Sequence, residues 1–234
     1  MATDLQTDVA TRSRTRKIPP LENGDRLTGP EFLRRYEAMP DLKKAELIEG
    51  VVHKPAAAVS QDHAGPNFIF NGWMFFYQAH TRGTEGGDNA TLKLGLDNLP
   101  QPDGFLRITP ECGGQSRTED RYVIGAPELI GEISATTASR DLNVKLNVYR
   151  KHGVTEYVVW RVFDEALDWF VLRDGQYERL PLVDGLYQSE VFPGLWLDAA
   201  AMIGGDLARG LQIAQQGIAT PEHAEFVRRL QQRQ

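Results

Sequence analysis

Cysteine is almost missing from this chain of 234 residues, which contains Cys112 alone. One cysteine excludes an internal disulfide framework and is typical of a reducing compartment, so we expect a cytoplasmic protein. Long apolar runs are missing too. The most apolar stretch, residues 68–77, is interrupted by Asn71 and Gly72 and is far too short to span a bilayer. The first residues lack the apolar core of a secretory signal, and we expect no membrane partner.

The motifs of several large enzyme classes are also absent. The sequence has no Walker loop, no dinucleotide-binding glycine fingerprint, no HExxH and no GxSxG. Cys112 and a few scattered histidines give no evidence for thiol catalysis. A glycosidase-type pair of carboxylates stays open, because a sequence does not give the distance between two acids.

The charge balance is acidic, with a formal net charge of -6. Proteins that hold nucleic acid through its phosphates usually present a basic face, so this balance argues against nucleic-acid binding. It does not exclude a local basic patch, because the field depends on where the charges lie. Carboxylates clustered at a metal site would also add to the acidic total.

The chain divides into three parts by composition. Residues 1–24 are polar, carry several arginines and end near Pro19 and Pro20, which predicts a flexible N-terminal arm. Residues 25–198 are expected to form one domain. Residues 199–234 form a helical extension whose apolar residues, Leu207, Leu211 and Ile213, pack either on this domain or on a dimer partner.

The predicted elements are those of a mixed α/β protein. Thr28 and Glu31 form a capping box that opens a first helix, and a hairpin turns at Glu49-Gly50. A second helix is expected over residues 61–81 and a third over 140–152, closed by Gly153. Strands are expected over 90–96, 103–108 and 127–134, followed by an antiparallel run over 156–162, 166–172 and 176–182.

Two acids at predicted strands are candidates for chemistry. Asp103 opens the strand at 103–108, where an acid can project into a cleft, although turns favour aspartate on their own account. Glu132 lies inside an apolar strand, where a carboxylate is costly unless it is paired or bound to a metal. Alternation sets Ile130 and Glu132 on one face of that strand; the alternative interpretation of Glu132 is a structural ion pair.

Lys145 is the candidate cation. On the predicted third helix it falls inside the apolar arc, so its side chain points toward the sheet or extends past it. The simpler interpretation is a surface pair with Asp141 one turn earlier. Glu46, at the start of the hairpin, is a possible fourth acid, and His63 and Glu49 are weaker candidates. Tyr149, one turn after Lys145, could bound the same pocket or simply pack in the core.

These residue types suit one reaction in particular. Metal-assisted cleavage of a phosphodiester needs carboxylates that converge on a divalent cation, with a positive charge nearby. Mg²⁺ prefers oxygen ligands and keeps several waters, so few protein ligands suffice.

The ordered set of segments AELIEGVV, QPDGFLRI, APELIGEIS and DLNVKLNVYRKHGVTEYVVWRV resembles the Uma-two family of putative restriction endonucleases, within the PD-(D/E)XK nuclease superfamily. The resemblance extends over most of the chain. It implies a mixed central sheet between helices, dependence on Mg²⁺ or Mn²⁺, DNA as the substrate and frequent homodimerisation.

The resemblance also assigns roles to residues. The first acid of the family falls on Asp103, the second on Glu132, and the helix acid on Glu46. The superfamily lysine would stand at position 134, which is Ser134 here, so the lysine role passes to Lys145. The resemblance therefore implies Asp103, Glu132 and Glu46 as metal ligands, with help from the Ile133 carbonyl, and Lys145 as the catalytic cation.

Three functions remain open from the sequence. The first is a metal-dependent DNA endonuclease. The second is a catalytically silent nucleic-acid-binding or regulatory module on the same fold, with the acids in structural ion pairs. The third is a metal-dependent hydrolase of a substrate other than nucleic acid, which the acidic balance makes plausible.

Overall fold

The computed structural model of the chain describes residues 17–55 and 60–233, and its centre is a six-stranded mixed sheet. The strand order is β11-β10-β9-β8-β5-β3, and only the pair β8–β9 is parallel. The sheet strands are β3 (Thr84–Gly87), β5 (Gly104–Ile108), β8 (Leu129–Ser134), β9 (Glu156–Arg161), β10 (Ala166–Arg173) and β11 (Gln176–Arg179). The central strand β8 is buried on both faces of the sheet, which explains why its sequence is almost continuously apolar.

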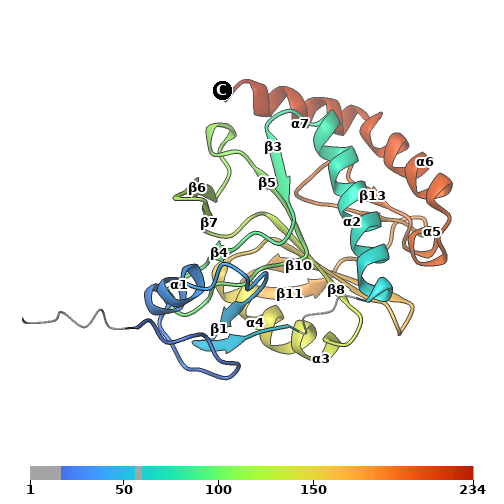
Figure 1. Cartoon of the computed structure of the whole chain (residues 1–234). Coiled ribbons are helices and arrows are strands. Elements are labelled where there is room, and N and C mark those ends of the chain that lie inside the picture. The colour runs from blue at the N-terminus through green and yellow to red at the C-terminus, as the bar shows by residue number, and fades with distance from the viewer. Residues whose placement is uncertain (1–16, 56–59, 234) are drawn as a thin grey trace, which may run out of the picture.

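Helices cover both faces of the sheet (Figure 1). On one face, α2 (Gln61–His80) and the C-terminal helices pack in a core that includes Leu129 and Ile133 of β8. On the other face, α4 (Leu146–His152) packs in a second core with Ile130. The predicted alternation along this strand is therefore confirmed, and the fold is the mixed α/β sandwich expected from the sequence.

A third, smaller core lies beneath α1 (Gly29–Glu37) and the hairpin of β1 (Glu46–Ile48) and β2 (Val51–His53). Leu21 is buried in this core, next to Phe32. The arm expected over 1–24 therefore ends earlier than predicted. Its residues 1–16 lie outside the described residues.

Most predicted elements are present, and the differences are local. The hairpin turns at Glu49 and Gly50, both with positive φ as such a tight turn requires. Thr28 makes no side-chain cap, and the Glu31 carboxylate accepts hydrogen bonds from Arg34 and Arg35. The predicted strand at 90–96 shortens to β4 (Leu92–Lys93), which belongs to a separate three-stranded sheet with β7 (Tyr122–Ile124) and β6 (Arg117–Glu119).

The third helix starts slightly earlier than predicted and is irregular. It begins with α3 (Ala138–Arg140), passes through a π-helical turn, η2 (Asp141–Lys145), and continues as α4. Gly153 ends it in the left-handed conformation, as predicted. A short η1 turn (Pro110–Cys112) and the strand pair β12 (Tyr187–Gln188) and β13 (Trp196–Leu197) complete the connections.

The C-terminal segment packs on its own domain through α5 (Ala199–Gly204), α6 (Leu207–Ile218) and α7 (Pro221–Gln231). Phe226 and Leu230 join the core beneath α2, and Ile213 is buried. Leu207 and Leu211 stay about half exposed. In the described part of the chain, every helix is too short or too polar to cross a membrane.

Candidate active site

Two neighbouring strands bring the two predicted acids together. In the antiparallel pairing of β5 with β8, Gly104 lies opposite Gly131. Continued by one residue, the same register sets Asp103 opposite Glu132. Residues directly opposite in an antiparallel pair lie on the same face with Cβ atoms about 5 Å apart. The Asp103 charge accordingly contributes to raising the pKa of Glu132.

Asp103 is buried, but its partners reach it from the open side of the site. Its Oδ1 atom lies 3.0 Å from the Nζ of Lys44 and 3.5 Å from the Nε2 of His63. Its Oδ2 atom accepts a hydrogen bond of 2.9 Å from the Ile133 amide. Asn71 of α2 donates to its main-chain carbonyl at 3.0 Å. Asp103 therefore fixes the end of β5 against β8 while its other oxygen faces Lys44 and His63.

These contacts keep Asp103 ionised. Burial alone would raise the pKa of the Asp103 carboxyl, but the contact with His63 and the Lys44 charge outweigh it and hold the pKa well below its usual range. The same contact raises the pKa of His63.

Glu132 is buried on the α4 side of the sheet and has different partners. Its Oε1 atom accepts hydrogen bonds from the Nζ of Lys145 at 2.8 Å and from the hydroxyl of Tyr149 at 2.7 Å. Both donors lie on the helix that follows β8. Tyr149 therefore belongs to the site cluster as well as to the core, which were the two alternatives that the sequence left open.

The π-helical turn η2 explains how a lysine on a helix meets a strand acid. Lys145 is its last residue and is fully buried, and its ammonium lies 2.8 Å from both Glu132 and Glu46. Single π-helical turns within α-helices are found frequently at functional sites. Asp141, 4.0 Å from the Lys145 ammonium, accepts from the Ser134 hydroxyl, so the serine at the usual lysine position anchors this turn.

Glu46 is the second buried carboxylate on Lys145. Its Oε1 atom accepts a hydrogen bond of 2.9 Å from the Gln101 amide, which fixes it beside the loop that leads to Asp103. Burial alone would raise the pKa of Glu46, but the charges of Lys145, Lys44 and Arg140 lower it. Burial raises the pKa of Glu132, and the Lys145 charge offsets only part of that increase. One ammonium shared by two carboxylates thus leaves Glu132 as the readier of the two to take a proton.

A cleft of about 910 Å³ opens over these residues. Its walls come from the hairpin and the segment before it, from α2, from the ends of β5 and β8, and from the turn between β9 and β10. Basic side chains line it alongside the acids, namely Lys43, Lys44, Lys54 and Arg140. Asp103, Glu132, Glu46 and Lys145 line the same cleft, so the four main sequence candidates are brought together.

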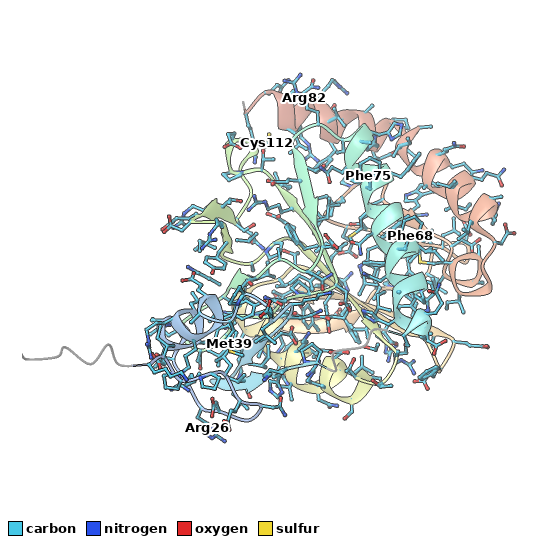
Figure 2. The ribbon with its side chains drawn as sticks, in the orientation of Figure 1. Arg26, Met39, Phe68, Phe75, Arg82 and Cys112 are labelled. Atoms are coloured by element: carbon cyan, nitrogen blue, oxygen red, sulfur yellow. The ribbon has the colours of Figure 1, made fainter. Side chains whose placement is uncertain are left out.

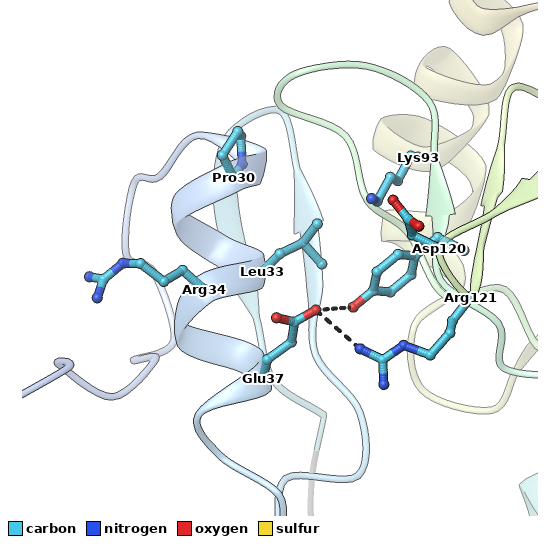
Figure 3. A pocket seen from close by; sticks show the side chains of 8 residues that line it. Pro30, Leu33, Arg34, Glu37, Lys93, Asp120 and Arg121 are labelled. Atoms are coloured by element: carbon cyan, nitrogen blue, oxygen red, sulfur yellow. Dashed lines mark hydrogen bonds and ion pairs between the residues drawn. The ribbon is translucent and has the colours of Figure 1, made fainter.

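A second hollow, of about 590 Å³, lies between α1 and the β6–β7 turn (Figure 3). Glu37 accepts a hydrogen bond of 2.8 Å from the Tyr122 hydroxyl there and lies 3.5 Å from Arg121. The side chains of Glu37 and Arg121 are 50% and 82% exposed, so they pair in a solvated environment where ion pairs contribute little. The acid-lined cleft is therefore the candidate active site.

The donor atoms in the cleft suit a hard divalent cation. The His63 ring lies between two of these oxygens, with its Nε2 3.5 Å from Asp103 Oδ1 and its Nδ1 3.0 Å from the Ile133 carbonyl. Over residues 17–55 and 60–233, no group of three or more His, Cys, Asp and Glu side chains is arranged to hold an ion. Two carboxylates and a carbonyl are still a sufficient set for Mg²⁺, which keeps several of its waters.

Sequence reasoning missed Lys44 and underrated His63. Lys44 lies just before the first hairpin strand, where a lysine is usually only a solvated surface residue. His63 was a weak candidate because a lone histidine on a helix carries no specific signal. Glu49, the other weak candidate, lies away from the cleft and pairs with Lys151 on the surface.

The chain shares its fold with a solved structure. A solved structure described as a putative nuclease belonging to DUF820, from Anabaena variabilis ATCC 29413, matches it with a TM-score of 0.53 and 16% sequence identity. The match covers 73% of this chain and 98% of that one. No curated protein matches the chain.

The chain belongs to the Uma2 family, described as "Putative restriction endonuclease", whose model matches residues 30–200. The match extends from α1 through all the strands of the sheet to the start of α5, and it includes every residue of the candidate site. The resemblance inferred from the sequence is therefore confirmed at the level of the family and the fold.

Proposed function

We propose that this protein is a divalent-metal-dependent endonuclease that hydrolyses phosphodiester bonds in DNA. The observation that carries the proposal is the meeting of Asp103 and Glu132 on neighbouring strands at one cleft, with buried Lys145 in contact with Glu132. Membership of the Uma2 family supports it.

In this proposal Asp103, Glu132 and the Ile133 carbonyl hold Mg²⁺ or Mn²⁺, with Glu46 behind them as a further acid. The ion would supply Lewis-acid polarisation of the phosphate and a more acidic bound water. Lys145 and Tyr149 donate to the same oxygen of Glu132 and so orient its carboxylate. Lys44 and Arg140, at the cleft wall, offset charge on the phosphate.

The setting follows from the same proposal. DNA is the partner, bound through the basic side chains of the cleft although the whole chain is acidic. We further propose a homodimer, in which the half-exposed Leu207 and Leu211 of α6 are available to a second copy, and a cytoplasmic location.

The test combines metal binding with cleavage. Mg²⁺ and Mn²⁺ are titrated calorimetrically into the wild type and an Asp103→Asn/Glu132→Gln variant, and both proteins are then assayed for nicking of a supercoiled plasmid. We expect the wild type to bind metal and nick, and the variant to lose both. Asp88→Asn is the matched control, since Asp88 is an exposed acid of the same cleft and should keep both activities.

Two other outcomes would replace the proposal. Metal binding without nicking of any nucleic acid would favour a hydrolase of another substrate. Absence of metal binding by the wild type would favour the silent nucleic-acid-binding module. A specific observation makes that module the main rival: each acid already has a cation beside it, Lys44 for Asp103 and Lys145 for Glu132.

A further inference from the structure

Two exposed phenylalanines stand at the candidate active site. Phe68 is 81% exposed and Phe163 is 63% exposed, and both line the cleft that contains the acids. Isolated apolar residues on a surface need no explanation. Two aromatic rings from distant parts of the sequence at one cleft, beside charged residues, are a different arrangement.

Each ring is carried by a well-anchored element. Phe68 lies on α2 (Figure 2). Buried Phe70 and Trp73 hold this helix in the core, and its residues His63 and Asn71 contact Asp103. The helix that carries Phe68 is therefore held by the core on this face of the sheet.

Phe163 lies in the tight turn between β9 and β10. The turn is tied to the site strand, because the Val162 amide donates to the Ser134 carbonyl at 3.0 Å. On either side of the ring, Arg161 pairs with Asp164 and with Asp168 at 2.5 Å and 2.8 Å. A residue presented in this way can receive a ligand without first paying much of the entropy cost of ordering a loop.

The rest of the cleft complements a nucleic-acid strand. Lys43, Lys44, Lys54 and Arg140 supply positive charge for phosphates. Amide side chains line the cleft too, and amides can exchange hydrogen bonds with the edges of exposed bases. These are Asn67, Asn71 and Asn89.

A phenyl ring can stack on a base only where that base is accessible. Inside a duplex, both faces of each base are covered by the neighbouring pairs, so aromatic platforms serve single strands or flipped bases. We propose that Phe68 and Phe163 form a base-stacking platform, and that the substrate of this site is DNA with unpaired bases. This inference rests on the proposed function and names its substrate class.

The experiment measures DNA binding without cleavage. A fluorescein-labelled 20-mer single strand and a blunt duplex of the same sequence are titrated with full-length protein in EDTA, with anisotropy as the readout. We expect tighter binding of the single strand. Phe68→Ala and Phe163→Ala should each weaken that binding by about 5- to 100-fold, the range for loss of one base–aromatic stack.

A matched control lies on the same helix. Phe75 is 69% exposed on α2 but does not line the cleft, so Phe75→Ala should leave binding unchanged (Figure 2). Phe68→Trp should retain the affinity that Phe68→Ala loses. Because Phe68 and Phe163 are exposed, both alanine variants should fold, as thermal melting will check.

Several results would overturn the platform. They are equal or tighter binding of the duplex, an unchanged affinity in Phe68→Ala and Phe163→Ala, an equal loss in Phe75→Ala, or no binding of either DNA. Since the measurement needs neither metal nor turnover, its failure is separate from failure of the proposed nuclease. Single-strand binding that depends on Phe68 without any nicking would keep the platform and reject the catalysis.

Discussion

Asp103 and Glu132 are neighbours across one strand pair, yet they lie in opposite electrostatic environments. Asp103 meets Lys44 and His63, whose side chains are partly open to solvent at 25% and 26% exposed. Glu132 meets the ammonium of Lys145, whose side chain is 2% exposed and which also serves Glu46. The pKa of Asp103 is lowered and the pKa of Glu132 is raised.

The difference shows that burial alone does not decide the charge of a carboxylate. Both acids are buried, but Lys44 and His63 both contact Asp103, whereas Glu132 shares the ammonium of Lys145 with Glu46. An acid that is ionised and faces the cleft is ready to receive a cation. An acid that takes a proton readily removes one negative charge from the site while no metal cation is bound.

The largest expected effect on stability comes from removing the buried partner of Glu132. Lys145→Met would leave Glu46 and Glu132 buried without their ammonium, which costs about 3–5 kcal/mol in the free energy of unfolding. Urea denaturation at neutral pH measures it. Lys151→Met, on the same helix but 57% exposed, is the matched control and should change stability by less than about 1 kcal/mol.

If Lys145→Met does not fold, the double variant Lys145→Met/Glu132→Gln provides a second test. Removing one unpaired carboxylate should restore part of the lost stability, because the two residues are directly coupled. Losses from Lys145→Met as small as those from Lys151→Met would show that the ammonium is not sealed between the acids.

A second effect, on the order of 2 kcal/mol, separates the two acids by pH. Asp103 has a lowered pKa, so its stabilisation is present above the ordinary aspartate pKa of about 3.9 and is lost as the pH falls further. Glu132 has a raised pKa, so the stability linked to its proton is fully present below about 4.3 and is lost as the pH rises through the folded-state value.

The measurement is the free energy of unfolding from pH 3 to pH 9 for the wild type, Asp103→Asn and Glu132→Gln. We expect Asp103→Asn to flatten the acid side of the profile and Glu132→Gln to flatten the alkaline side. The comparison between the acids fails if both variants flatten the same side.

The smallest expected effect on stability comes from removing a partly exposed partner of Asp103. Lys44→Gln removes a partly exposed partner of Asp103 and should cost no more than about 1 kcal/mol, because solvent and His63 remain to compensate. Lys43→Gln, at the exposed neighbouring residue, should have no measurable effect. Thermal melting of both variants tests this. A loss from Lys44→Gln as large as that from Lys145→Met would show that the two acids are equally sealed.

Much of the fold follows from local pattern. The apolar strand with Glu132 inside it, the Glu49-Gly50 turn and the Gly153 stop are all signals within a few residues, and the structure contains each of them. Short strands at the edges of the sheet were harder to predict from the sequence. The β3 strand has the sequence Thr-Glu-Gly-Gly, which shows no strand pattern. It is a strand because it pairs with β5 at the edge of the sheet, a contact that local sequence does not reveal.

The candidate site divides in the same way. Asp103, Glu132 and Lys145 stand out because each is a charged residue in an apolar or strand-end context. Lys44 does not, because its importance comes from a contact 59 residues away along the chain. The π-helical turn that ends at Lys145 also has no signal in single-sequence periodicity, so the sequence left open whether this lysine points toward the sheet or extends past it.

The most direct test of the account is to locate Mn²⁺ in crystals of the wild-type protein by anomalous diffraction. We predict an ion in the acid-lined cleft, bound at about 2 Å by carboxylate oxygens of both Asp103 and Glu132, with Lys44 and His63 moved from Asp103 Oδ1. An ion bound elsewhere, or crystals soaked in Mn²⁺ with Asp103 still paired to Lys44 and no ion in the cleft, would contradict the shared metal site.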